Sequence, residues 1–347
     1  MVAGGTQTAP GGELSLQAVC NWASAAFGAD AVVVVPRALH FATLPPGPRY
    51  VPVGRLRALT TEFIGLNARC DTYVGLGDRL PILSRAARSV LVLQNANIYT
   101  SHGRDVPWTR RAKYEVQRRW ASWSFRRADR VVASTATAAD LALASLGADA
   151  EKIDVIPIPP IDVVRARTSQ SQVLRTIILV GEVRANKRFT WALGEIATWA
   201  SARGAPIRVV HVGQVPNTAA GQAFRDAAAG LDSIECELRG SLPHVEAMRA
   251  LADADLLVFP SKLESHGIPL SEAMASGVPV VCSDIPAFRD VGGASPTYFS
   301  GADGTLAAAL ASVEPDGIRS RMAEVGLGLV PLDGAWKLLA EAAPLRR

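Results

Sequence analysis

The residues with the clearest chemical potential lie in one stretch, 261–280, which follows an apolar run ending at Pro260. Two carboxylates stand in it, Glu264 and Glu272, with seven residues between them. A carboxylate can accept two hydrogen bonds, so each of them suits a pair of neighbouring hydroxyls, one on a sugar and one on a ribose. The alternative is a solvated charge in a loop at Glu264 and an ordinary acidic residue near a helix start at Glu272.

The same stretch predicts a short helix over 270–276, with Pro269 at its start and Gly277 at its end. Proline suits the first position of a helix and glycine the residue after its last turn. We expect free N–H groups near Leu270 and Ser271, which together with the positive helix end would bind an anion. The segment follows a predicted strand, and open α/β sheets bind ligands at the carboxyl ends of their strands.

A second group of chemically useful residues is cationic and follows the predicted strand 176–181. Arg184, Lys187 and Arg188 stand there within five positions. A Lys or Arg placed on a diphosphate would stabilise the negative charge that grows on this leaving group, by several kcal/mol, about what an oxyanion donor supplies. Such a site would work without a metal ion. The alternative is a solvated helix start.

Composition limits what else the chain can be. Its 347 residues suit two α/β domains, and a net charge of +4 is too small to indicate nucleic acid. The four cysteines and five histidines are scattered, so we expect neither a disulfide framework nor a metal site. The first residues have no basic and apolar signal-peptide pattern, and no apolar run approaches the ~20 residues of a membrane span. We therefore expect a cytoplasmic protein.

Strand-like and helix-like segments alternate along the chain, which predicts doubly wound parallel sheets in an α/β fold. The predicted strands are continuous apolar runs, typical of strands buried on both faces: 31–35, 72–75, 89–93, 130–134, 153–158, 176–181, 207–213, 234–239, 255–260, 278–283 and 296–299. The main predicted helices are 14–27, 190–203, 245–252 and 270–276. A Pro-Pro pair and a polar stretch at 159–172 favour two Rossmann-like domains facing a cleft, 1–167 and 168–330, and a final helix over 331–347 that returns to the first domain.

The order of residues in 259–284 resembles the signature of the family-4 (group 1) retaining glycosyltransferases of the GT-B fold. The resemblance rests on Glu-x7-Glu with Gly-x-Pro inside it, followed by Glu-Ala-Met-Ala-x-Gly-x-Pro-Val-Val, and a weaker match covers most of 177–303. It implies that Glu264 and the backbone of residues 266–268 meet the donor sugar and that Glu272 meets the ribose. The implied donor-binding residues are Gly181, Glu182, Lys187, Ser241, Ser265, His266, Gly267, Ile268, Leu270, Ser271 and Glu272. The candidates for catalysis are Glu264, Lys187 and Arg184.

One position departs from the family pattern. Relatives usually carry Arg directly after the glycine and Lys five residues later; Lys187 matches, but Glu182 occupies the Arg position. Arg184 could supply the missing charge from another angle, or the donor could be held more weakly.

The first half carries weaker signals. Gly11 and Gly12 resemble the Gly-Gly loop of the family that closes on the donor phosphates, although no clear strand precedes them. Asn95 and Asn97 follow the strand 89–93 and should point into the cleft, where many relatives have a His. The segment 108–130 is a basic helix with tryptophans. It suits contact with an anionic membrane and a lipid-linked acceptor, or alternatively the core, because it has two opposed apolar stripes.

The expected function is therefore retaining, metal-independent transfer of a hexosyl group from a nucleotide-diphosphate sugar to a glycan, glycolipid or small molecule. Such an enzyme would serve bacterial surface polysaccharide or glycoconjugate synthesis, in the cytoplasm or at the inner face of the membrane. Two alternatives remain: a nucleotide-sugar epimerase of the same fold, and a non-catalytic partner that binds a nucleotide sugar. The sequence names neither the sugar, the base nor the acceptor.

Overall fold

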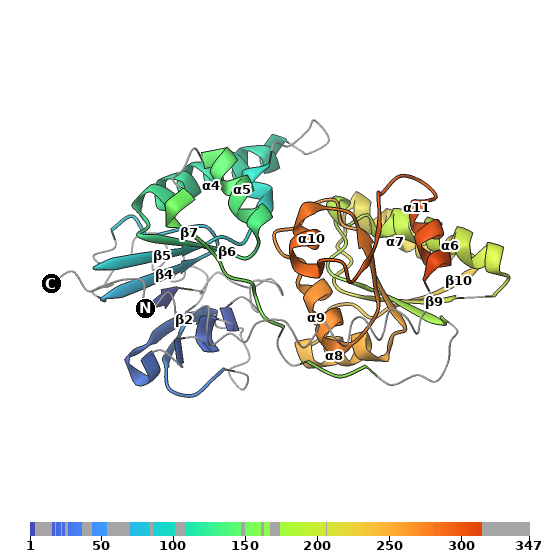
Figure 1. The fold of residues 1–347 in the computed structure, drawn as a ribbon, viewed down its shortest axis with the longest axis horizontal. Coiled ribbons are helices and arrows are strands. Elements are labelled where there is room, and N and C mark those ends of the chain that lie inside the picture. Colours follow the sequence, from blue (N-terminus) through green and yellow to red (C-terminus); the bar gives the residue numbers. More distant parts are fainter. Residues whose placement is uncertain are drawn as a thin grey trace. The chain divides into compact units, whose positions relative to one another are not determined.

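The computed structural model describes residues 1–3, 16–17, 19–21, 23–24, 27–36, 44–53, 70–83, 86–100, 108–146, 150–160, 163–166, 174–205 and 207–313. These residues belong to two compact units that divide between Pro159 and Pro160 (Figure 1). The predicted helix 331–347 lies outside the described residues. Within the predicted helix 14–27, the described residues 16–17, 19–21, 23–24 and 27 are all helical. The predicted domain bounds stay predictions.

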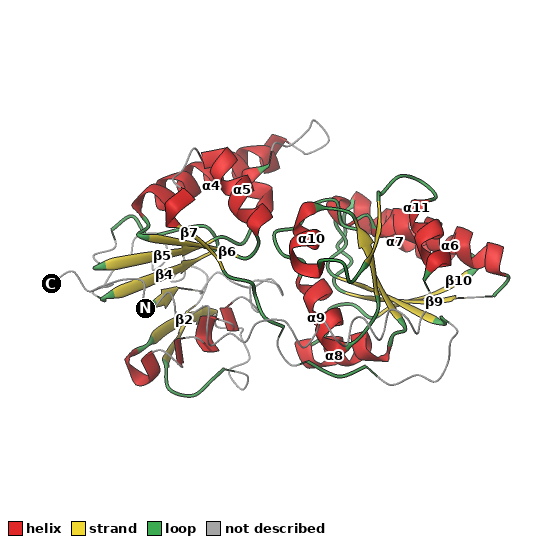
Figure 2. Ribbon diagram, viewed as in Figure 1, coloured by secondary structure: helices red, strands yellow, loops and turns green. Residues whose placement is uncertain are grey.

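The first unit is built on a parallel sheet with the strand order β3-β2-β1-β4-β5-β6-β7. Figure 2 labels five of its strands, β2 and β4 to β7. Its strands are β1 (Val2–Ala3), β2 (Val32–Pro36), β3 (Arg49–Val53), β4 (Thr72–Leu76), β5 (Arg88–Val92), β6 (Arg130–Ala133) and β7 (Ile153–Val155). The further helices described in this unit are α3 (Ala96–Tyr99), α4 (Trp108–Arg127) and α5 (Ala136–Leu146), with short 3-10 turns at Gly28–Asp30 and Ala150–Lys152.

Two strands of this sheet were not predicted. Strand β1 has only two residues, so it gives no run to recognise, yet Val2 pairs with both Val33 and Val74 at the middle of the sheet. Strand β3 contains Pro52, which has no N–H for a ladder; the strand lies at the sheet edge, where proline is tolerated.

The second unit has a six-stranded parallel sheet with the order β10-β9-β8-β11-β12-β13. Its strands are β8 (Thr176–Val180), β9 (Ile207–Val212), β10 (Ile234–Leu238), β11 (Leu256–Phe259), β12 (Val280–Ser283) and β13 (Thr297–Phe299). All four residues of β11 are buried, as expected for a central strand covered on both faces. The predicted strands of this unit are confirmed with ends that differ by one or two residues.

The helices of the second unit cover its sheet on both sides (Figure 1). They are α6 (Phe189–Arg203), α7 (Ala219–Gly230), α8 (His244–Asp253), α9 (Ile268–Ser276), α10 (Pro286–Gly292) and α11 (Thr305–Ser312), with a 3-10 turn η4 at Ala185–Lys187. Helix α9 starts two residues before the predicted position and ends, as predicted, at a left-handed Gly277 with φ 78°. No helix in the described part of the chain is long and apolar enough to cross a membrane.

Candidate functional site

The strand order of the second unit places two chemically rich loops next to each other. Strands β8 and β11 are neighbours, with Ile177 opposite Leu256. From β8 the sheet grows through β9 in one direction and from β11 through β12 in the other. Such a switch in strand order leaves a crevice beyond the carboxyl ends of the two strands, which is where α/β sheets bind ligands. The cationic loop after β8 and the acidic loop after β11 both begin there.

Lys187 and Glu264 meet between these two loops. The Lys187 Nζ lies 2.5 Å from Glu264 Oε1, and each side chain is only 16% exposed. The ammonium also lies 4.9 Å from the ring centroid of Phe259, the last residue of β11. Asn186 ties the two loops together, because its carbonyl accepts the Lys262 N–H at 2.8 Å and its amide donates to the Leu263 carbonyl at 3.3 Å. The structure thus brings together the two strongest sequence candidates for catalysis.

Arg184, the third candidate, pairs with the residue that departs from the family pattern. Its guanidinium lies 2.5 Å from the Glu182 carboxylate, and the side chains are 52% and 32% exposed. Each charge is therefore compensated by the other. Arg188 does not join this pair, because its guanidinium stacks on the Trp191 ring at 3.7 Å from the ring centroid. Burial lowers the pKa of Arg188, and the charges of Asp303 and Glu195 oppose that shift.

The loop after β11 ends at Gly267, whose conformation only glycine adopts easily. Its φ is +85°, and a Cβ there would lie 2.6 Å from Phe288 Cε1. Phe288 in turn stacks on Phe259, with 4.8 Å between ring centroids. The start of α9 is therefore held close to the end of β11 by tight packing.

The first turn of α9 contradicts the prediction of free N–H groups near Leu270 and Ser271. The N–H groups of Leu270 and Ser271 are not free, since both donate to the Gly267 carbonyl, at 2.8 and 3.4 Å. The Ser271 hydroxyl is also engaged, because it donates to the Ile268 carbonyl at 2.9 Å. The N–H groups of this first turn are therefore hydrogen-bonded within the helix. Any contact with an anion at this helix start must be made by N–H groups before Leu270. His266 is buried beside them.

Glu272 lies one turn further along α9 and is 5% exposed. Burial raises its pKa to about 8, which leaves most of the carboxyl protonated near neutral pH. Its Oε1 has no hydrogen-bond partner among the described residues, and the His244 Nε2 atom lies 3.6 Å from it. His244 is the first residue of α8 and was missed, because nothing in the sequence joins two residues 28 positions apart (272 − 244). Ser241, a predicted donor residue, lies exposed in the loop before α8.

In the first unit, Asn95 and Asn97 bond to each other. Asn95 caps α3 and its Oδ1 accepts from the Asn97 N–H at 3.2 Å and from the Asn97 amide at 3.0 Å. Sequence reasoning missed the buried Asp78, which accepts from the Tyr99 hydroxyl at 2.5 Å and from the N–H groups of Gln94 and Asn95 at 3.1 and 3.2 Å. Asp78 therefore holds the loop that carries the asparagines. Gly11 and Gly12 lie outside the described residues.

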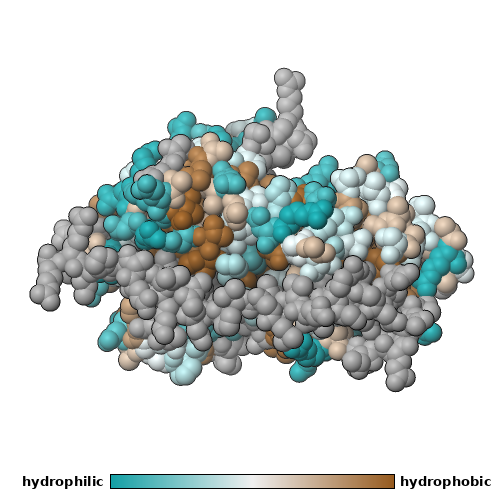
Figure 3. All heavy atoms as spheres, in the orientation of Figure 1, coloured by the Kyte–Doolittle hydropathy of each residue, from teal (hydrophilic) through white to brown (hydrophobic). Residues whose placement is uncertain are grey.

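Helix α4 is the basic helix that the sequence predicts. The stripe with Ala121 and Phe125 is fully buried, which places that face in the core of the first unit. The opposite apolar stripe is only partly buried. Its Val116 is 64% exposed to solvent, whereas its Trp120 is partly buried and donates its indole N–H to the Leu80 carbonyl at 3.0 Å. Trp108, at the helix start, is 74% exposed. Hydrophilic and hydrophobic side chains lie side by side over the first unit in Figure 3.

Metal ligands do not gather in the part of the chain described here, where no three His, Cys, Asp or Glu side chains are placed to hold an ion. The loops after β8 and β11 instead hold the Lys187–Glu264 and Arg184–Glu182 ion pairs, and helix α9 adds the buried carboxyl of Glu272. This set can meet a diphosphate with a cation and hydroxyl groups with carboxyls.

Two Rossmann-like units with parallel sheets are the fold of the GT-B glycosyltransferases, and solved structures of that class share it. The structure of Anabaena HepE in complex with UDP-glucose superposes with a TM-score of 0.73 at 15% identity, over 96% of each chain. Sucrose-phosphate synthase of Thermosynechococcus elongatus superposes with a TM-score of 0.71 at 14% identity, over 99% of this chain and 96% of that one.

Sequence comparison identifies the family within that class. Residues 174–313 match the family described as glycosyl transferases group 1, and residues 15–159 match the glycosyl transferase 4-like domain. The chain therefore belongs to the group 1 glycosyltransferases, which confirms the family and the fold class predicted from the motif.

Two named relatives share part of the chain. The D-inositol 3-phosphate glycosyltransferase of Nocardia farcinica is 30% identical over an alignment of 198 residues, and the alignment covers 52% of this chain and 41% of that protein. The 2-deoxystreptamine glucosyltransferase of Streptomyces kanamyceticus is 30% identical over an alignment of 192 residues, and the alignment covers 51% of this chain and 49% of that protein. The matched part thus spans less than half the length of either relative.

Proposed function

We propose that the chain transfers a hexosyl group from a nucleotide-diphosphate sugar, with retention of the anomeric configuration. The observation that carries the proposal is the Lys187–Glu264 pair at the switch point of the second sheet, with 2.5 Å between Nζ and Oε1. A cation and a carboxylate held together there can serve the two ends of the bond that breaks. The cation faces the diphosphate, and the carboxylate faces the sugar.

The proposed roles follow from where charge changes during the reaction. Negative charge grows on the diphosphate as the glycosidic bond breaks, so Lys187 stabilises the transition state more than the ground state. Glu264 orients the sugar hydroxyls. Glu272 binds the ribose, which is unchanged by the reaction, so it contributes to binding. Retention then follows from attack of the acceptor on the face that the diphosphate leaves, without a divalent ion.

Arg184 has a smaller proposed role. Its guanidinium is half exposed and already paired with Glu182, so only part of its charge is available to the diphosphate. Glu182, Ser241, Ser265 and the backbone of residues 266–268 complete the proposed donor site.

The proposed acceptor is a glycan, a glycolipid or a small molecule of bacterial glycoconjugate synthesis. The names of the two relatives each include a small molecule, inositol 3-phosphate in one and 2-deoxystreptamine in the other. These names favour a small-molecule acceptor for this chain as well. A lipid-linked acceptor would need membrane contact, for which the exposed Trp108 and Val116 of α4 are the candidates. Flotation with anionic liposomes that weakens as salt rises would support this contact, and equal recovery with neutral and anionic vesicles would refute it.

A thermal-shift series with UDP-, GDP- and dTDP-sugars tests the donor. A ligand at a hundredfold excess over its Kd stabilises the folded protein by about 2.7 kcal/mol, which is a clear shift in melting temperature. We expect one base to give that shift and Glu272→Ala to reduce it. No shift with any of the three classes would contradict the proposal.

The second candidate is a non-catalytic nucleotide-sugar binder. The Glu182–Arg184 ion pair favours it, because Glu182 replaces a donor-binding cation of the family pattern and neutralises the nearest substitute. Hydrolysis of the donor without acceptor separates the two: a transferase releases some free sugar, and a pure binder releases none.

A further inference from the structure

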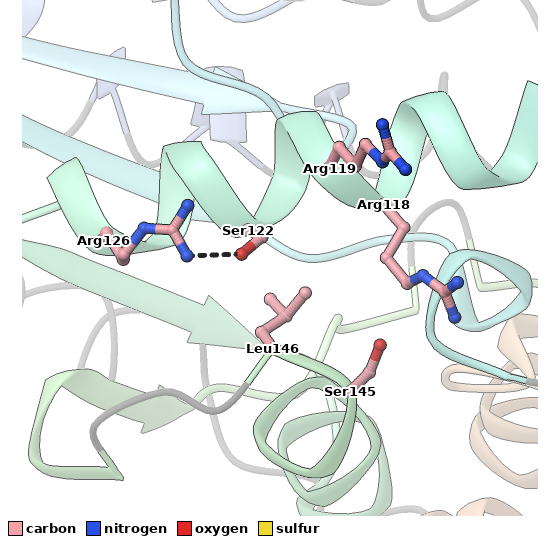
Figure 4. Close-up of a pocket in the computed structure, with 6 residues that line it drawn as sticks. All are labelled: Arg118, Arg119, Ser122, Arg126, Ser145 and Leu146. Carbon is pink, nitrogen blue, oxygen red and sulfur yellow. Dashed lines mark hydrogen bonds between the residues drawn. The ribbon is translucent and has the colours of Figure 1, made fainter.

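A groove in the first unit has no part in the proposed donor site. It lies between helices α4 and α5 and has a volume of about 250 Å³. Figure 4 shows its lining, which consists of Arg118, Arg119, Ser122 and Arg126 from α4 and of Ser145 and Leu146 from α5. Ser122 and Arg126 follow Arg118 at intervals of four residues, so the three lie on one face of the helix.

The groove is strongly positive. Arg118 and Arg119 both pair with one carboxylate, Glu115, one turn earlier on α4. The Arg126 guanidinium donates to the Ser122 hydroxyl at 2.8 Å and has no carboxylate partner among the described residues. Two of the three guanidinium groups thus share one carboxylate and the third has none, which leaves a local excess of two positive charges.

A buried hydroxyl completes the lining. The Ser145 Oγ is inaccessible and has no hydrogen-bond partner in the described part of the chain. In Figure 4 it points from α5 towards α4, between Arg118 and Ser122. A buried polar group without a partner is costly, and rotation about the Cα–Cβ bond would turn this hydroxyl into the groove, where a ligand oxygen can accept its hydrogen bond.

We propose that the α4–α5 groove binds a phosphate monoester or a diphosphate group. Such a group carries about two negative charges, which matches the local excess, and its oxygens accept hydrogen bonds from guanidinium forks and from the Ser145 hydroxyl. The volume is below that of a site for a drug-sized ligand, which suits a headgroup of this size. The proposal is independent of sugar transfer, because none of the groove residues belongs to the donor site.

The proposal is tested by the reactivity of single arginines. The full chain is treated with phenylglyoxal in the presence and absence of inorganic pyrophosphate, and the modification of each arginine is followed by mass spectrometry of its peptide. We expect at least about fivefold protection of Arg126, and none of the exposed Arg249 in the second unit. Equal protection of both, or none at Arg126, overturns the proposal.

Matched variants and vesicles sharpen the result. Ser145→Ala should weaken the protection of Arg118 and Arg126 by about tenfold in pyrophosphate concentration, because one charge-assisted hydrogen bond is lost. Lys113→Gln, which removes an exposed charge from α4 outside the groove, should leave it unchanged. Protection by phosphatidic acid vesicles as well as by pyrophosphate assigns the group to a lipid, and protection by pyrophosphate alone to a soluble ligand. Protection by phosphatidylglycerol vesicles without protection by pyrophosphate refutes the site, because surface charge alone would then explain it.

Discussion

Glu272→Gln should remove a large pH dependence of stability from the second unit. The carboxyl is 5% exposed, and burial raises its pKa from an ordinary 4.5 to about 8. Gln has the same shape but does not titrate, so the substitution removes the proton equilibrium and little else.

The direction and the size of this pH dependence follow from the linkage between proton binding and folding. Below pH 4.5 the folded and unfolded chains both hold the proton, and Glu272 adds nothing to the pH dependence. Between pH 4.5 and 8 the unfolded chain loses the proton while the folded chain keeps it, so stability falls as pH rises. The slope is at most about 1.4 kcal/mol per pH unit, and the whole window amounts to roughly 3 to 5 kcal/mol.

Urea unfolding of the second unit at pH 5, 6, 7 and 8 measures this slope. We expect the stability of Glu272→Gln relative to the parent to rise steadily with pH over that range. Glu235→Gln, an isosteric change at an exposed carboxylate of β10, is the control and should follow the parent. If Glu272→Gln kept the parental slope, the carboxyl would be ionised in the folded protein and the burial argument would be wrong.

Three further outcomes are expected. Gly267→Ala should lower the stability of the second unit by roughly 2 kcal/mol more than Gly204→Ala. Both positions have a positive φ, but only at Gly267 does a Cβ meet Phe288, and equal melting temperatures would contradict that contact. Turnover should survive EDTA; activity that is lost in EDTA and restored by Mn²⁺ or Mg²⁺ would show a metal requirement. Arg184→Ala should lower kcat by less than about tenfold in steady-state assays, because the guanidinium is exposed and paired with Glu182; a larger loss would make it a main diphosphate contact.

The second unit was predictable because its elements carry local signals. Strand β11 is buried on both faces, so it reads as an apolar run, and the Glu-x7-Glu spacing identifies the loop and helix after it. The Lys187–Glu264 pair follows once both loops start from neighbouring strands.

Other features depend on contacts between distant parts of the chain and leave no local trace. Strand β1 is two residues long and is defined by its neighbours on both sides. His244 becomes relevant to Glu272 only through the packing of α8 beside α9. The N–H groups of Leu270 and Ser271 were expected to be free because a short helix was assumed to start at Leu270, whereas the helix begins at Ile268 and closes its first turn on Gly267.

The central claim is that Lys187 acts on the diphosphate and Glu272 on the ribose, and steady-state kinetics of two variants test it most directly. After a check that each variant melts like the parent, Glu272→Ala should raise the donor KM more than it lowers kcat, because ribose binding is the same in ground state and transition state. Lys187→Ala should lower kcat by roughly a hundredfold or more, because its contact strengthens only as the bond breaks. Parental turnover by Lys187→Ala would contradict the account.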